Sequence, residues 1–132
     1  MERMYQNDEF VCVELNGLRI ERVITCMSDE RDNVIVLYLK VEALGWFDFF
    51  IDSGIAVMEK IKEIEEDDSY IYLDKSQELE AIGVKIKSIY CQPIKSSCRL
   101  TIALENNTNL ILQSIDMKDY ESDVKLLLLD LG

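Results

Sequence analysis

The sequence contains no histidine. This absence removes the commonest general base and the commonest metal ligand, together with every Ser-His or Cys-His nucleophile pair. The five glycines are scattered and form no phosphate-binding loop of the G-x-G-x-x-G or G-K-[ST] type. We therefore expect a protein that is not an enzyme and that has no catalytic residue, no cofactor and no metal site.

Basic residues are also scarce. Fourteen lysines and arginines stand against 26 acidic residues, which gives a formal net charge of −12. Binding of nucleic acid through its phosphates needs a basic surface, so we expect no nucleic-acid partner. An acidic surface instead attracts basic proteins, and we expect a partner of that kind.

Long apolar runs and an export signal are missing as well. The first ten residues contain no apolar stretch of the kind found in a signal peptide. The apolar runs, among them those at 46–51 and 126–129, are too short to cross a bilayer. We expect a cytoplasmic protein without membrane contact, whose four cysteines are reduced thiols in the core.

Two segments of the chain have nearly the same sequence. GLRIERV at 17–23 and GVKIKSI at 83–89 both run through glycine, an apolar residue, a cation, isoleucine, two mainly polar residues and a β-branched residue. In each copy the apolar alternation slips by one position just before the last residue, Val23 or Ile89. A slip of this kind is typical of a β-bulge, so both segments are predicted to be bulged strands.

Each of these strands is followed by two further strand patterns. In the first copy a polar turn is expected at 28–33. The result is a three-stranded antiparallel meander that occurs twice, at 15–52 and 80–116, within a single domain of residues 1–132. A meander cannot bury its apolar face alone, so we expect the two to form a sandwich or a half-barrel.

The segment between the copies, residues 53–67, shows helical spacing. Apolar residues recur about every three positions from Ile55 to Ile64, and Ser53 is a suitable N-cap. We expect one amphipathic helix here, and a short helix in the tail at 124–131. The predicted fold class is therefore α+β, with strands dominating.

An acidic run lies at the end of the predicted helix. Carboxylates at a helix C-terminus face the negative end of the macrodipole, which costs a few tenths of a kcal/mol for each. Such a cluster is either a solvated helix end or a surface that attracts a basic partner. On the second interpretation the partner-binding residues are Glu63, Glu65, Glu66, Asp67 and Asp68.

The strand at 46–52 is rich in aromatic residues. If its side chains alternate, Phe47, Phe49 and Ile51 face one way, while Trp46, Asp48, Phe50 and Asp52 face the other. A face that combines two aromatic residues with acids has the composition of an interface hot spot, although a plain core strand would also contain aromatics. We add to the candidate partner-binding residues Trp46, Asp48 and Phe50.

The order of a Gly-apolar-cation-Ile strand, a polar turn, an apolar strand, an Asn-rich turn and a last strand resembles that of small bacterial β-rich proteins. Several groups of these are immunity proteins of polymorphic-toxin or contact-dependent inhibition systems. The resemblance covers residues 15–52 and 80–116 and assigns no functional residue. It implies a small, acidic, non-catalytic protein that caps a basic toxin.

The leading hypothesis is therefore a non-enzymatic protein-binding module, namely an immunity-type inhibitor that caps a basic toxin. Two alternatives stay open. One is a ligand-binding or regulatory β-domain whose pocket lies between the two meanders. The other is an acidic mimic of nucleic acid that blocks a DNA-handling protein.

Overall fold

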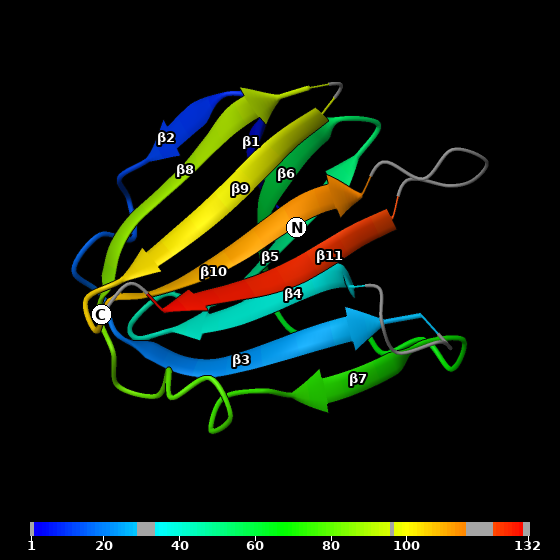
Figure 1. Cartoon of the computed structure of the whole chain (residues 1–132). Coiled ribbons are helices and arrows are strands. Elements are labelled where there is room, and N and C mark those ends of the chain that lie inside the picture. Colours follow the sequence, from blue (N-terminus) through cyan, green and yellow to red (C-terminus); the bar gives the residue numbers. More distant parts are fainter. Residues whose placement is uncertain (1, 29–33, 96, 116–122, 131–132) are drawn as a thin grey trace.

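The computed structural model of the chain describes residues 2–28, 34–95, 97–115 and 123–130. These residues form eleven β-strands and no helix (Figure 1). In chain order the strands are β1 (Glu2–Asn7), β2 (Phe10–Cys12), β3 (Ile20–Met27), β4 (Val34–Val41), β5 (Gly45–Asp52), β6 (Ile55–Ile61), β7 (Ile71–Asp74), β8 (Ile86–Ile94), β9 (Ser97–Leu104), β10 (Thr108–Ile115) and β11 (Asp123–Asp130).

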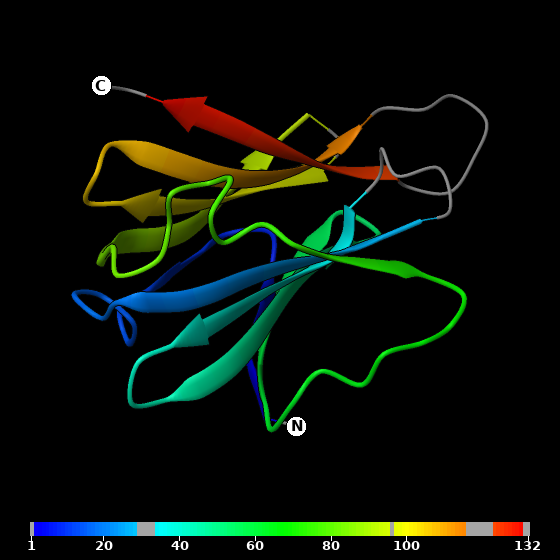
Figure 2. The same cartoon turned by 90° about the horizontal axis from the view of Figure 1, so that it is seen from below.

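The strands make two antiparallel sheets that lie face to face as a β-sandwich (Figure 2). Sheet A has the order β1-β6-β5-β4-β3-β7, and sheet B has the order β11-β10-β9-β8-β2. Buried apolar side chains of both sheets form one cluster, which includes Phe47 and Phe49 from sheet A and Leu100 and Ile102 from sheet B. Burial of one such side chain contributes about 1.5–3 kcal/mol.

Three consecutive strands of each repeat form a meander, β3-β4-β5 in sheet A and β8-β9-β10 in sheet B. The pairing register shifts between Ile20 and Arg22 in the first meander and between Ile86 and Ser88 in the second. The two predicted bulges are confirmed, and they occupy equivalent positions. Residues 29–33 of the predicted turn lie outside the described part of the chain.

The two repeated segments also bind each other. Gly17 and Gly83 have φ angles of 83° and 79°, values that glycine adopts without steric cost. The Gly17 amide donates a hydrogen bond of 2.7 Å to the carbonyl oxygen of Ile86, and the Gly83 amide donates one of 2.7 Å to that of Ile20. Each repeat therefore supplies the partner for the opening turn of the other.

The first strand of each repeat belongs to the other repeat's sheet. β2 precedes β3 in the chain but pairs with β8, whereas β7 precedes β8 but pairs with β3. The repeats thus extend beyond the predicted bounds of 15–52 and 80–116. They run from β2 to β6 and from β7 to β11, and they exchange their first strands. This exchange joins the two halves more closely than packing of two independent meanders would.

The predicted helix at 53–67 is wrong, and with it the α+β fold class, because the described residues are all-β. Asp52 pairs directly with Ile55, so only Ser53 and Gly54 lie in the turn between β5 and β6. Their φ angles are 53° and 80°, the left-handed pair that a type I′ hairpin turn requires. The supposed N-cap is therefore the first residue of a hairpin turn.

Residues 62–70, which we call the acidic loop, connect β6 to β7 without helical structure. The acids of this loop therefore do not face the negative end of a helix macrodipole. The tail is also not helical, since Asp123–Asp130 form β11 and pair with β10. Among the described residues no helix has the length and apolar character to span a membrane.

Candidate functional site

The aromatic strand β5 separates its side chains between the two faces of sheet A, as predicted. Phe47 and Phe49 are buried in the core, while Trp46 and Phe50 are half-buried on the outer face. Asp48 also belongs to the outer face, yet only 9% of its surface is exposed. An ionisable group so deeply buried needs a local explanation.

The register of sheet A places Asp48 in a row of polar side chains. Tyr38 of β4 and Glu59 of β6 are its direct neighbours on the two adjacent strands, and Arg3 of β1 lies opposite Glu59. The Arg3 guanidinium donates to the Oε2 atom of Glu59 from Nη2 at 2.7 Å and from Nε at 3.0 Å. Glu59 itself is only 3% exposed. The row therefore holds two buried carboxyl groups and one cation.

Asp48 is the carboxyl group of this row that receives none of the hydrogen bonds of Arg3. Its Oδ1 atom is buried and has no hydrogen-bond partner. Burial, followed by the negative charge of Glu59 and a hydrogen bond with Glu59, raises the pKa of Asp48 to about 7, against a smaller lowering effect of Arg3. Near neutral pH the group is therefore divided between its acid and carboxylate forms.

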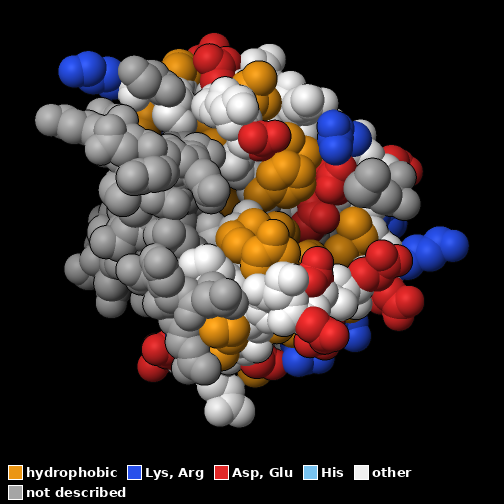
Figure 3. Space-filling view, turned by 90° about the vertical axis from the view of Figure 1, so that its right-hand side faces the viewer, with side chains coloured by type: hydrophobic (Ala, Val, Ile, Leu, Met, Phe, Trp, Pro, Cys, Tyr) orange, Lys and Arg blue, Asp and Glu red, His pale blue; other side chains and the backbone are white. Residues whose placement is uncertain are grey.

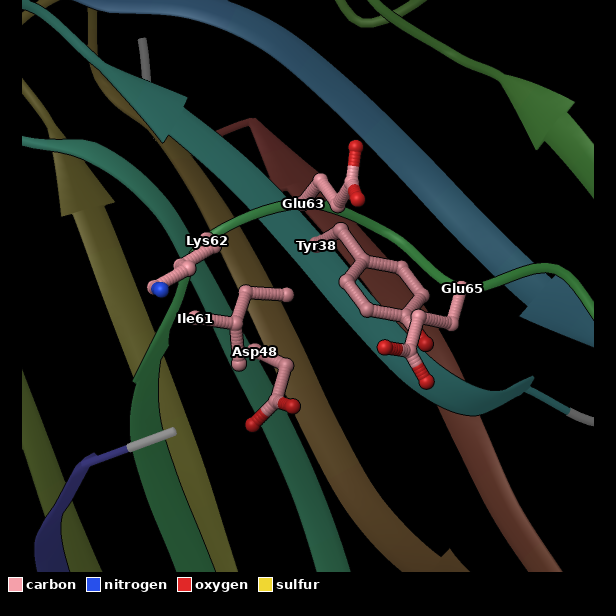
Figure 4. Close-up of a pocket in the computed structure, with 6 residues that line it drawn as sticks. All are labelled: Tyr38, Asp48, Ile61, Lys62, Glu63 and Glu65. Atoms are coloured by element: carbon pink, nitrogen blue, oxygen red, sulfur yellow. The ribbon is translucent and has the colours of Figure 1, made fainter.

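A pocket opens in front of Asp48. It has a volume of about 310 Å³ and lies between the outer face of sheet A and the start of the acidic loop (Figure 4). In Figure 4 the Glu65 side chain turns toward the Tyr38 ring, whereas the Lys62 side chain points away from this ring. The lining residues are Tyr38, Asp48, Ile61, Lys62, Glu63 and Glu65.

Acidic and apolar side chains lie close together on the surface of the molecule. Figure 3, which views the side of the molecule to the right in Figure 1, shows acidic atoms lying deep between hydrophobic side chains. Trp46 lies on the outer face beside the guanidinium of Arg22, whose central carbon is 5.9 Å from the ring centre. Aromatic rings close to carboxylates are suited to binding of cations.

Contacts with β7 hold the acidic loop against sheet A. The Asp67 amide donates a hydrogen bond of 2.9 Å to the Tyr72 hydroxyl oxygen, and the Tyr72 ring lies 6.5 Å from that of Tyr38. The Asp67 carboxylate accepts a hydrogen bond of 2.8 Å from the Ser69 amide. Burial is the main cause that raises the pKa of Tyr38, so its hydroxyl stays protonated.

The structure brings together only part of the predicted binding residues. Asp48, Glu63 and Glu65 meet at the pocket, although 15 positions separate Asp48 from Glu63 in the sequence. Glu66 and Asp68 are exposed in the acidic loop without lining the pocket. For Asp67 the structure shows a turn-stabilising role, and Trp46 and Phe50 flank Asp48 on the same strand.

Sequence reasoning missed Tyr38, Glu59 and Arg3. The signal for Glu59 was present in the turn residues Ser53 and Gly54. A two-residue turn there pairs position 52 with position 55, and the same register puts Asp48 opposite Glu59. The helix prediction placed Glu59 on a solvated face and concealed this pair.

The described residues hold no group of three or more histidine, cysteine or acidic side chains that suits a metal ion. All four cysteines are free and buried, as predicted. Searches with the chain against family models, curated proteins and solved structures find no match. A function is therefore inferred from the geometry of the Asp48 pocket and its surroundings.

Proposed function

We propose that the chain is a non-enzymatic binding protein for a basic protein partner, and that the partner binds the outer face of sheet A. The observation that carries this proposal is the convergence of the aromatic strand and the acidic loop. Asp48 from β5 and Glu63 and Glu65 from the loop line one pocket. Trp46 and Phe50 lie half-buried on either side of Asp48 along the same strand.

Binding would proceed through two contributions. The exposed carboxylates of the acidic loop lie within a few residues of one another and act together on a charge approaching within a Debye length, about 8 Å at physiological salt. Such an arrangement accelerates association with a basic protein. The half-buried aromatic side chains then contribute short-range affinity, since aromatic residues at the centre of an interface contribute most of its binding energy.

The finer proposal is that the partner is a toxin domain and that the chain inhibits it in the cytoplasm. Its support is the resemblance of the repeated strand pattern to immunity proteins, together with the net charge of −12. The test is to express the product of the adjacent upstream gene in a host cell with and without this chain. Growth inhibition that the chain does not relieve would contradict this role.

Selection from a displayed random peptide library tests binding of basic partners directly, because it does not require the natural partner. We expect the selected peptides to be enriched in arginine and lysine and to bind faster at low salt. A selection that yields no binder, or binders without such enrichment, would overturn the proposal.

A pair of charge-matched variants locates the binding surface. The loop variant neutralises four acids while it keeps Asp67, whose carboxylate stabilises the turn. The control variant neutralises four exposed acids elsewhere. We expect the association rate of the selected peptides to fall about tenfold in the loop variant and to change little in the control. The loop variant is E63Q/E65Q/E66Q/D68N, and the control is E9Q/E78Q/E80Q/E105Q.

A further inference from the structure

We propose that the Asp48 pocket receives one guanidinium group, the side-chain end of an arginine of the basic partner. The inference deepens the proposed function and rests on it for the source of the arginine. It concerns a single subsite, whose chemistry can be tested with a small probe.

Among the described residues, no cation forms an ion pair with Asp48. Facing it are Tyr38 from β4, Glu59 from β6 and Arg3 from β1, and the acidic loop adds Lys62, Glu63 and Glu65. The Arg3 guanidinium donates twice to one oxygen of Glu59 and once to the side-chain oxygen of Gln6. The buried Oδ1 atom of Asp48 has no hydrogen-bond donor. A buried carboxyl group without an ion-pair partner is costly to ionise, so a cation bound beside it in the pocket gains affinity from its charge.

The shape and lining of the pocket favour a guanidinium over an ammonium group. A volume of about 310 Å³ is at the lower end of the usual range for ligand pockets, ~300–1,000 Å³, and suits one side chain. The Tyr38 ring offers a planar surface for a planar cation. Carboxyl groups of Asp48 and Glu65, which both line the pocket, can accept the several N–H donors of one guanidinium.

Binding of the cation changes the protonation of Asp48. Because the pKa of Asp48 is raised to about 7, a fraction of the molecules carries the acid form near neutral pH. A bound guanidinium stabilises the carboxylate, so the O–H bond of the acid form breaks and the proton passes to water. Affinity should therefore fall as the pH decreases below about 7, by up to tenfold for each pH unit.

The test is calorimetric titration of the full chain with Nα-acetyl-arginine amide, Nα-acetyl-lysine amide and the neutral Nα-acetyl-citrulline amide. We expect the arginine probe to bind with a dissociation constant on the order of 1 mM. The lysine probe should bind about twofold to fivefold more weakly, and the citrulline probe should not bind measurably. Titrations in buffers of different ionisation enthalpy should show that a fraction of a proton is released near neutral pH.

Variants assign the effect to the pocket. D48N should weaken binding of the arginine probe about tenfold and abolish proton release, and E65Q should weaken it less because this group is exposed in the loop. E105Q removes a charge that is also exposed, in the turn between β9 and β10, and should change nothing. Equal binding of the arginine and citrulline probes, or unchanged binding by D48N, would overturn the inference.

The outcome is separable from that of the proposed function. If the selected basic peptides bind through the acidic loop but the arginine probe does not bind, the guanidinium subsite is wrong and the proposed function stands. If the arginine probe binds with proton release but the peptide selection fails, the subsite stands and the proposed function is wrong.

Discussion

Arg19 and Lys85 face each other across an antiparallel bridge and occupy equivalent positions in the two repeats. The hydrogen bonds around this pair are reciprocal. The Ile20 amide donates to the Val84 carbonyl oxygen at 2.9 Å, and the Ile86 amide donates to that of Leu18 at 2.8 Å. The pair therefore lies on a local twofold axis, which relates the two sheets at the edge where the repeats begin.

This symmetry predicts equal effects of Gly17→Ala and Gly83→Ala. Both glycines have φ near +80°, and a new Cβ would meet no atom within 4 Å, so the cost is backbone strain alone. We expect each variant to lower the free energy of unfolding by about 1–2 kcal/mol in urea titrations. Asn16→Ala, at an exposed position in the same turn, is the control. A cost at only one of the glycines would contradict the symmetry.

The turn between β5 and β6 gives a second prediction. Ser53 has a φ of 53°, a conformation that asparagine adopts more readily than serine. Ser53→Asn gives the turn the sequence Asn-Gly, which type I′ turns favour, and should raise the free energy of unfolding by about 0.5 kcal/mol. Gly54→Ala should lower it by about 1 kcal/mol, since φ is 80° there. A loss of stability in Ser53→Asn, or a gain in Gly54→Ala, in urea titrations would contradict the hairpin.

The raised pKa of Asp48 makes stability depend on pH. Between the ordinary pKa of 3.8 and the folded value of about 7, the folded chain binds more protons at Asp48 than the unfolded chain does. The contribution of Asp48 is therefore most favourable below about pH 4 and is lost as the pH rises to about 7. The loss is on the order of 2 kcal/mol, reduced by partial solvent screening and by the coupling to Glu59.

Replacement of Asp48 by asparagine should remove this dependence. We expect D48N to be more stable than the unmodified chain at about pH 8 and to differ less from it at about pH 5, as measured by urea denaturation. D52N, which neutralises an exposed acid at the end of the same strand, is the matched control. An unchanged pH profile in D48N would show that Asp48 is not the group responsible.

The ion pair of Arg3 and Glu59 should contribute more to the free energy of unfolding than the ion pair of Arg22 and Asp74. Both are close, at 2.7 Å and 2.8 Å, but the Glu59 side chain is only 4% exposed, whereas that of Asp74 is 46% exposed. Arg3→Gln leaves the buried Glu59 carboxylate without its ion-pair partner and should cost about 1–3 kcal/mol in urea titrations.

The comparison with the exposed pair serves as the control. Arg22→Gln should cost under about 1 kcal/mol, because exposed ion pairs contribute little. Adding Glu59→Gln to Arg3→Gln should restore much of the lost stability, since the buried charge is then removed as well. Equal costs for the two arginine variants would contradict the role of burial at Glu59.

The meanders were predictable because the first strand of each has an alternation of apolar and polar residues. In both strands this alternation slips by one position, after Ile20 and after Ile86. The helix was wrong because β6 is apolar on both of its faces, as the buried pair Ala56 and Val57 shows. A strand that is covered on both sides has no clear alternation, and its apolar residues then match helical spacing by chance. The turn residues Ser53 and Gly54 were the better signal.

The site was predictable only where it depends on one strand. Alternation along β5 placed Asp48 among the outer residues, whereas its neighbours Tyr38 and Glu59 follow from the register of three strands. The exchange of β2 and β7 between the repeats could not be predicted from the sequence either. These pairings join distant parts of the chain through only three or four residues each.

The exchanged strands constrain how the chain folds as it leaves the ribosome. When the first repeat has emerged, β3 has no neighbour on one side until β7 has been synthesised, and β2 has none until β8 has followed. The nascent first half thus presents unpaired strand edges that invite association with other chains. Delay at this stage of synthesis would favour dimers in which two molecules complete each other's sheets.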